Sequence, residues 1–311
     1  MTAAPVRVLV DCDNTLGEYR SEIDDGLAII MLLAAGVEVV GITTTYGNGP
    51  LARVHERTQE LLIRLGREDI PVVRGASCSG DLKTPAAAFV ASAVGRYGSS
   101  LRILAIGPLT NLHAALVHDP ALASQVSGIY AMGGYERRLR FLRREVAELN
   151  LSADPEAAYA VLTAGWPVTL ASAQLCLQAR YGLRHLLVDW VRSSAADSAF
   201  RRELRRRITA WFLAFSIDVG AAGFYLWDLV PAWLVLDPSR FFHRHAVIMS
   251  TPADLKTGTL RLGEEIVGGA SPRGCGVIDV PTRIRRGWRF ARDCARLWRR
   301  MATCREGTLH G

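Results

Sequence analysis

The chain has 311 residues, half of them hydrophobic, and a formal net charge of +7. This length and composition are typical of a globular protein with a large core, so we expect a single domain over residues 1–311. The six scattered cysteines form no CxxC pair, which argues against a disulfide framework or a zinc site. No apolar run is long enough to span a bilayer and the N-terminus lacks a signal-peptide pattern, so we expect a cytoplasmic protein without a membrane partner.

Strand-like and helix-like segments alternate along the chain. The strand pattern covers residues 6–10, 37–45, 70–73, 101–106, 129–132 and 168–170, and the helical pattern covers residues 26–35, 51–65, 85–97 and 109–117. Another helix is expected after Asp154, which would be its N-cap, with Pro155 at the first helical position. Repeated strand–helix units with short connections predict an α/β fold with an open, mainly parallel β-sheet and helices on both faces.

Two later segments are rich in arginine. Residues 193–218 have the pattern of a long helix, which we expect to lie near the functional site. Residues 283–305 contain nine arginines and one acidic residue, Asp293. We expect a basic C-terminal helix over about 284–303, and its inward-facing side chains would be Trp288, Phe290, Ala291, Leu297, Trp298 and Met301. Because charged runs on helices are usually solvated faces, we expect no nucleic-acid partner.

An acidic cluster follows the first predicted strand. Asp11 and Asp13 lie at the end of this strand, and Asp24 and Asp25 open the next helix after a short polar loop. In open α/β folds, ligands bind beyond the carboxyl ends of the strands. Four converging carboxylates repel one another unless a cation or a polyol lies between them. The cluster is therefore predicted to be a functional site.

Polar and glycine-containing motifs recur further along the chain. In chain order they are Asn48 after Thr45-Tyr46-Gly47, Gly107-Pro108-Leu109-Thr110-Asn111, Met132-Gly133-Gly134, Glu148-Leu149-Asn150, Trp227-Asp228 and Asp237-Pro238. Together with the acidic cluster, this ordered set resembles the nucleoside hydrolase family of the inosine–uridine type, from about Val6 to Asp237. The resemblance implies an α/β fold with a Rossmann-like core, one bound calcium ion, and hydrolysis of a nucleoside to free base and ribose. It also implies a homodimer or a homotetramer.

The resemblance assigns a role to individual residues. Asp13 would ligate calcium and act as the general base on the attacking water. The other calcium ligands would be Asp25, Asp228 and the backbone carbonyl of Ile106. The substrate would be held by Asp24, Asn48, Met132, Glu148, Asn150 and Trp227. These residue types suit calcium, which takes roughly six to eight oxygen ligands and lowers the pKa of a bound water.

The chain departs from the family pattern in two places. Residues 14–23 form a ten-residue link between Asp13 and Asp24, where the family usually has a very short one, and the link is expected to reshape the pocket mouth. Many members also carry a histidine before the late aspartate, as the acid for the leaving base, and Trp227 stands there instead. Its indole N–H is not acidic enough for this role, so stacking on a purine or modified purine is expected. The alternative is that Trp227 is a core aromatic residue, and the other aromatic candidates for stacking are Tyr46, Phe224 and Tyr225.

Two other functions are compatible with parts of the sequence. The segment from Asp11 to Leu16 also resembles the opening of haloacid-dehalogenase-like phosphatases, in which Asp11 would attack phosphorus, Asp13 would be the acid and magnesium would bind. That fold needs a later lysine, and neither Lys83 nor Lys256 follows a credible strand. A non-catalytic nucleoside-binding member of the hydrolase family is the third possibility, which the long link and the missing histidine permit.

Overall fold

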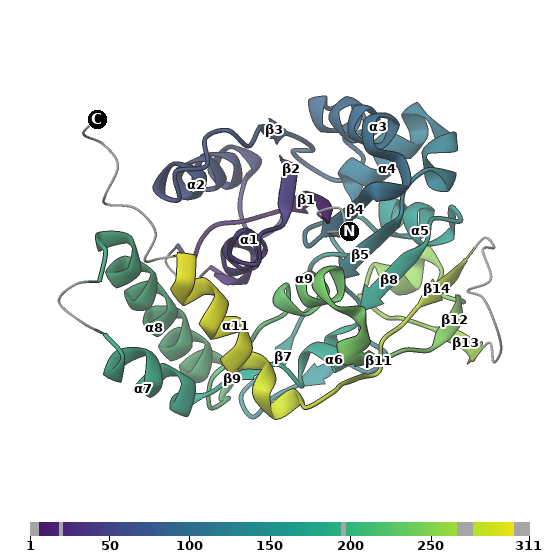
Figure 1. Cartoon of the computed structure of the whole chain (residues 1–311). Helices are drawn as coiled ribbons and strands as arrows, with labels where there is room; N and C mark the ends of the chain where they lie inside the picture. The colour runs from purple at the N-terminus through teal and green to yellow at the C-terminus, as the bar shows by residue number, and fades with distance from the viewer. Residues whose placement is uncertain (1–5, 19–20, 194–196, 266–275, 302–311) are drawn as a thin grey trace, which may run out of the picture.

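A computed structural model describes residues 6–18, 21–193, 197–265 and 276–301 of the chain (Figure 1). Its centre is a nine-stranded sheet with the order β13-β12-β14-β8-β5-β4-β1-β2-β3. The strands are β1 (Arg7–Cys12), β2 (Glu38–Thr44), β3 (Val72–Arg74), β4 (Leu101–Ala105), β5 (Gly128–Met132), β8 (Val168–Ala171), β12 (His245–Ile248), β13 (Leu262–Glu265) and β14 (Val277–Asp279). The pairs from β14 to β3 are parallel, and β12 pairs antiparallel with β13 and β14.

Helices cover both faces of this sheet (Figure 1). They are α1 (Asp24–Ala34), α2 (Leu51–Arg64), α3 (Pro85–Tyr97), α4 (Thr110–His118), α5 (Pro155–Thr163), α6 (Ala173–Cys176), α7 (Leu183–Val191), α8 (Ala199–Val219), α9 (Leu229–Leu236), α10 (Pro252–Leu255) and α11 (Gly287–Met301). Among the described helices, none is both long enough and apolar enough to cross a membrane. The predicted α/β fold, with an open and mainly parallel sheet, is confirmed.

The interior strand β1 contributes side chains to the two hydrophobic clusters that lie on opposite faces of the sheet. Val8, Val10 and Cys12 face the hydrophobic cluster that includes α1, α9 and α11, whereas Leu9 faces the cluster that includes α3, α4 and α5. Side chains of a strand alternate between the two faces of a sheet, so a strand covered on both sides reads as a continuous apolar run. The apolar segment before Asp11 is therefore buried on both faces.

Shorter elements surround the sheet. Three two-stranded pairs are β6 (Leu139–Arg140) with β7 (Glu145–Val146), β9 (Arg180–Tyr181) with β10 (Phe224–Tyr225), and β11 (Phe241–Phe242) with β15 (Arg283–Ile284). Three 3₁₀ turns cover Gly98–Ser100, Pro120–Ser124 and Pro238–Arg240. Residues 137–146 include five arginines, and the antiparallel pairing of β6 with β7 gives this segment regular backbone hydrogen bonds.

Several predicted boundaries follow from capping chemistry. The Asp154 carboxylate accepts a hydrogen bond from the Ala157 backbone N–H at 3.1 Å, and Pro155 is the first residue of α5, as the sequence predicted. The long helix predicted over residues 193–218 is α8, which begins after its N-cap residue Ser198. Residues 194–196 of that prediction lie outside the described residues.

The C-terminal helix α11 packs its apolar stripe inward. Phe290, Ala291, Cys294 and Trp298 are buried in the cluster that also contains α1. Trp288 was expected to face inward, and this prediction is wrong because its side chain is 62% exposed. Trp288 lies near the start of the helix, off the stripe of positions four residues apart, and arginine guanidinium groups of α11 lie over its ring instead. The expected end of the helix at residue 303 and the Met301 side chain lie outside what the structure describes.

Candidate active site

Asp13 follows the end of β1 and is fully buried. Asn48 holds its carboxylate from the loop after β2: the backbone N–H donates to Oδ2 at 2.7 Å, and Nδ2 donates to Oδ1 at 3.3 Å. Burial raises the pKa of Asp13 to about 7, and the hydrogen bond from the Asn48 backbone opposes this rise. A carboxylate with a pKa near neutrality is well suited to accept a proton from water.

The loop containing Asn48 needs a glycine before it. Gly47 has a φ of +147°, and a Cβ added there would lie 2.0 Å from Oδ2 of Asp13. Any side chain at this position would displace the Asp13 carboxylate or the loop that holds it.

Replacing Gly47 with alanine is expected to lower kcat/KM by roughly 100-fold or more, because shifts of about 1 Å in a catalytic group have effects of this size. Gly66→Ala is the matched control, since Gly66 also has a positive φ of +62° but its added Cβ would meet no atom within 4 Å. Steady-state kinetics and thermal melting of both variants check this prediction. Equal activity in the two variants would show that the contact with Asp13 does not matter.

Three other carboxylates meet beside Asp13. Asp24 and Asp25 open α1, and Asp228 immediately precedes α9. All three are buried, and each offers a ligand atom within 4.8 Å of the others. Oδ2 of Asp24 accepts a hydrogen bond from the Asp228 backbone N–H at 3.2 Å, while Oδ1 of Asp24 has no hydrogen-bond partner among the described residues.

This trio of carboxylates has the electrostatics of a cation site. Burial raises the pKa of Asp24 to about 6. Burial, and then the nearby negative charges, raise the pKa values of Asp25 and Asp228 well above their usual range. A hard divalent cation would offset this repulsion and would give the unpartnered oxygen of Asp24 a ligand. The residues present therefore fit a metal ion, which the family resemblance also implies.

These three carboxylates are not the same set as the calcium ligands expected from the sequence, which were Asp13, Asp25, Asp228 and the Ile106 carbonyl. Asp24, expected at the ribose, belongs to the trio, whereas Asp13 is joined to Asp25 through its own backbone N–H at 3.2 Å and through Asn48. The backbone carbonyl of Ile106 accepts a hydrogen bond from Asn150 Nδ2 at 3.2 Å.

A pocket opens beside the acidic cluster. Seven of the residues singled out from the sequence line it: Asn48, Ile106, Met132, Glu148, Asn150, Trp227 and Asp228. Other lining residues were not anticipated, namely Glu22, Tyr135, Leu139, Val146, Ala147, Leu149 and Ala173. Leu139 and Val146 belong to the β6–β7 hairpin, which forms an apolar part of the wall. The structure thus brings together side chains from β-strand ends, the hairpin and the inserted link.

Glu148 and Asn150 fix the wall of this pocket. The Glu148 carboxylate accepts hydrogen bonds from the backbone N–H groups of Gly134 at 3.2 Å, Leu151 at 2.9 Å and Ser152 at 2.7 Å. Burial raises the pKa of Glu148, and these backbone donors lower it. Nδ2 of Asn150 also donates to the Met132 carbonyl oxygen at 3.1 Å. Both side chains therefore tie the segment after β7 to the ends of the central strands.

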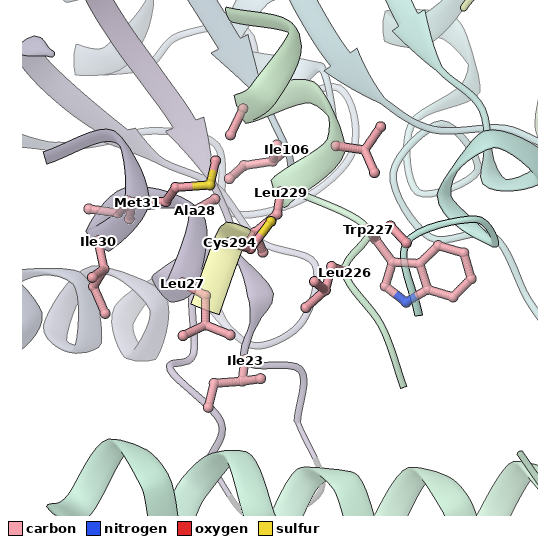
Figure 2. Close-up of a cluster of buried hydrophobic side chains, with 14 of the residues drawn as sticks. Ile23, Leu27, Ala28, Ile30, Met31, Ile106, Leu226, Trp227, Leu229 and Cys294 are labelled. Carbon is pink, nitrogen blue, oxygen red and sulfur yellow. The ribbon is translucent and has the colours of Figure 1, made fainter. Parts of the chain in front are cut away.

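Trp227 lies where the pocket meets the core. Figure 2 shows its indole at the edge of a cluster of buried side chains that includes Leu226 and Leu229. The side chain is buried and still lines the pocket, and the Tyr225 ring lies 5.2 Å from the Trp227 ring, centroid to centroid. The pocket-lining residues among those described do not include Tyr46, Phe224 or Tyr225. Trp227 is thus the one of these four aromatic candidates that lines this pocket among the described residues.

Asp11 has a structural environment. Its Oδ1 accepts hydrogen bonds from Thr43 Oγ1 at 2.6 Å and from Asn111 Nδ2 at 2.8 Å, which ties β1 to β2 and α4. Burial raises the pKa of Asp11 to about 6, and the two hydrogen bonds lower it in part. Asp11 is fully buried and does not line the pocket, so it is not placed to attack a phosphate there.

Comparisons with known proteins identify the family of the chain. The family model described as inosine-uridine preferring nucleoside hydrolase matches residues 8–275. The chain is 28% identical over 278 residues to the probable uridine nucleosidase 1 of Oryza sativa subsp. japonica, covering 79% of this chain and 83% of that protein. It is 26% identical over 305 residues to the inosine-uridine preferring nucleoside hydrolase of Crithidia fasciculata, covering 86% and 90%.

The fold is shared with solved structures as well. A plant nucleoside hydrolase superimposes with a TM-score of 0.78 and 24% identity, covering 97% of this chain and all of that one. The phosphatase alternative receives no support, because the hydrolase match spans both Asp11 and the late Asp228. The chain belongs to the inosine-uridine preferring nucleoside hydrolase family, and it is a glycosidase that acts on N-glycosyl bonds.

Proposed function

We propose that this enzyme is a calcium-dependent N-ribohydrolase that favours purine or modified purine nucleosides. The observation that carries the proposal is the buried carboxylate trio next to Asp13, at the end of a pocket lined by Trp227. Oxygen ligands without sulfur or imidazole are those that calcium takes in proteins.

The trio would hold the ion, and each group has a distinct part. Asp25 and Asp228 would ligate calcium, with Asp13 and the Ile106 carbonyl as further ligands. The unpartnered Oδ1 of Asp24 is available to the ion or to a ribose hydroxyl. When bound, the ion supplies positive charge that lowers the pKa of a nearby water and offsets the repulsion among the carboxylates.

The chain's own residues would then carry the reaction. Asp13, oriented by Asn48, accepts a proton from water as the water oxygen attacks the anomeric carbon. The bond from this carbon to the base breaks through an oxocarbenium-like transition state, and its electron pair leaves with the base. The base then takes up a proton from solvent, and Asp13 releases the proton that it accepted. The buried carboxylates stabilise the positive charge that develops on the sugar. We propose that Asn48, Glu148 and Asn150 bind ribose hydroxyls, with Met132 against the sugar.

The proposed purine preference rests on Trp227. The names of the relatives do not decide between the bases, since they include both a uridine enzyme and an inosine-uridine enzyme. The larger π-surface of a purine stacks better on an indole, and stacking supports the departing base.

On a panel of purine and pyrimidine nucleosides with calcium present, we expect the highest kcat/KM for purines, measured by release of base and reducing sugar. Trp227→Ala should reduce purine hydrolysis more than pyrimidine hydrolysis, and Trp227→Phe should retain part of the preference. A wild-type enzyme that prefers pyrimidines would contradict the purine assignment, and one that releases no base from any nucleoside would contradict the function.

Three further properties concern the whole protein: its domain organisation, its location and its assembly. We propose that residues 1–311 act as a single domain, that the protein is cytoplasmic, and that it assembles as a homodimer or homotetramer. The nucleoside would be its small-molecule partner, without nucleic acid.

A further inference from the structure

The inserted link between Asp13 and Asp24 ends with a carboxylate in the pocket. Glu22 lines the pocket together with Asn48, Trp227 and Asp228. The backbone carbonyl oxygen of Glu22 accepts hydrogen bonds from the Gly17 N–H at 2.9 Å and from the Thr15 hydroxyl at 3.1 Å, which closes the link. Among the described residues, no group donates a hydrogen bond to the Glu22 carboxylate and no cation pairs with it. Its acceptor oxygens are therefore available to a bound ligand.

The link is anchored on two sides, which holds Glu22 in place. Glu18 forms an ion pair with Arg57 on α2. Arg207 on α8 donates from Nη1 to the Leu16 carbonyl at 2.9 Å, and the Leu16 side chain is buried. On the other side of Glu22, Ile23 is fully buried. Ser21 Oγ donates to the Asn48 carbonyl at 3.5 Å, and Ile23 is held in the core, so the residues on each side of Glu22 are anchored before a substrate arrives.

The chemistry of this carboxylate limits what it can bind. An ionised carboxylate only accepts hydrogen bonds, so it attracts N–H donors and repels carbonyl oxygens that face it. Burial, and then the negative charges of Asp24 and Asp13, raise the pKa of Glu22 well above its usual range. Hydrogen bonds donated by a ligand would offset the cost of the ionised carboxylate at this position. A pocket built to hydrogen-bond one substrate group discriminates strongly against analogues that lack it.

We propose that Glu22 determines specificity for the base by accepting a hydrogen bond from an amino group on a purine held against Trp227. The proposal rests on the function proposed above, because Trp227 marks the base side of the pocket only if the substrate is a nucleoside. The long link, which has no counterpart in the usual family pattern, would thus supply a base contact that is particular to this chain.

The test compares nucleosides that differ by one amino group: adenosine with purine riboside, and guanosine with inosine. In the wild-type enzyme, the amino-bearing member of at least one pair should have roughly a 10- to 100-fold higher kcat/KM. Glu22→Ala should abolish this preference, and Glu22→Gln, which keeps the shape but replaces one acceptor oxygen with an N–H donor, should weaken it. Glu18→Gln is the matched control, since it removes a carboxylate of the same link that faces Arg57, and it should leave the preference unchanged.

Three results would overturn the proposal. The first is equal kcat/KM for both members of each pair in the wild-type enzyme. The second is a uniform loss on all four nucleosides in the Glu22 variants, which would indicate a contact with the shared ribose or a structural role. The third is a loss that tracks weakened calcium affinity, measured by calorimetry on each variant. If Glu22→Ala does not fold, the isosteric Glu22→Gln carries the test. A wild-type enzyme that cleaves no nucleoside would instead overturn the function, and the Glu22 proposal with it.

Discussion

Replacing Asp13 with asparagine is expected to lower kcat by about 100- to 10,000-fold, the usual contribution of a general base. The amide cannot take a proton from water, yet it has the shape of the carboxylate, and its oxygen can still accept the hydrogen bond from the Asn48 backbone. The fold should therefore persist. Measurement of kcat at saturating nucleoside and calcium, together with a thermal melt, checks this result.

Asp11→Asn is the matched control for that experiment. Asp11 is a buried aspartate of β1, two residues before Asp13; it is hydrogen-bonded to Thr43 and Asn111 and absent from the pocket wall. The variant should keep most of the wild-type kcat. The general-base assignment would be wrong if Asp13→Asn kept activity within about 10-fold of wild type, or if Asp11→Asn lost as much activity as Asp13→Asn.

Removal of calcium is expected to abolish activity and to make stability depend on pH. In the metal-free chain, the pKa values of Asp13 and Asp24 are about 7 and about 6, above the ordinary value of about 3.9 for an unfolded aspartate. The folded state therefore retains protons that the unfolded chain loses. The stability that these groups contribute is fully present below about pH 4 and is lost as pH rises through 6 to 7. Calcium replaces those protons, so its stabilising effect should grow over the same range.

Thermal melts in a chelator and in excess calcium, at pH 5, 6, 7 and 8, measure this effect. We expect the Tm in chelator to fall as the pH rises, and the gap between the two conditions to widen. Added calcium should restore activity to the chelated enzyme, and magnesium should restore less of it because it requires a tighter octahedral shell. A gap that stays constant with pH, or full activity in chelator, would contradict a calcium site made of these carboxylates.

Local patterns predicted most of the fold. The apolar run before Asp11 indicated a strand buried on both faces, and Asp154 followed by Pro155 marked the start of α5. Asp13, Asn48 and Met132 could be brought together from the sequence because they lie at or just after the ends of strands, and parallel strand ends lie at one edge of a sheet. Glu148, Asn150, Trp227 and Asp228 were assigned only through the family resemblance.

Other features depend on contacts that no local pattern records. The segment that forms the β6–β7 hairpin has five arginines among residues 137–144, and its place in the pocket wall follows from tertiary packing around Leu139 and Val146. No local pattern of the link between Asp13 and Asp24 marks Glu22, and its place follows from the pocket that it lines and from the anchoring of the link on α2 and α8. Trp288 was misplaced because an aromatic residue at the start of a helix can cover arginine stems as well as core.

A crystal structure with calcium and ribose tests the central claim most directly. We predict one calcium ion with carboxylate oxygens of Asp25 and Asp228 at about 2.3–2.6 Å, and ribose hydroxyls completing its shell. The anomeric carbon should face a water that is hydrogen-bonded to Asp13. An ion bound away from Asp24, Asp25 and Asp228, or ribose bound outside the pocket between Asn48 and Trp227, would contradict the account.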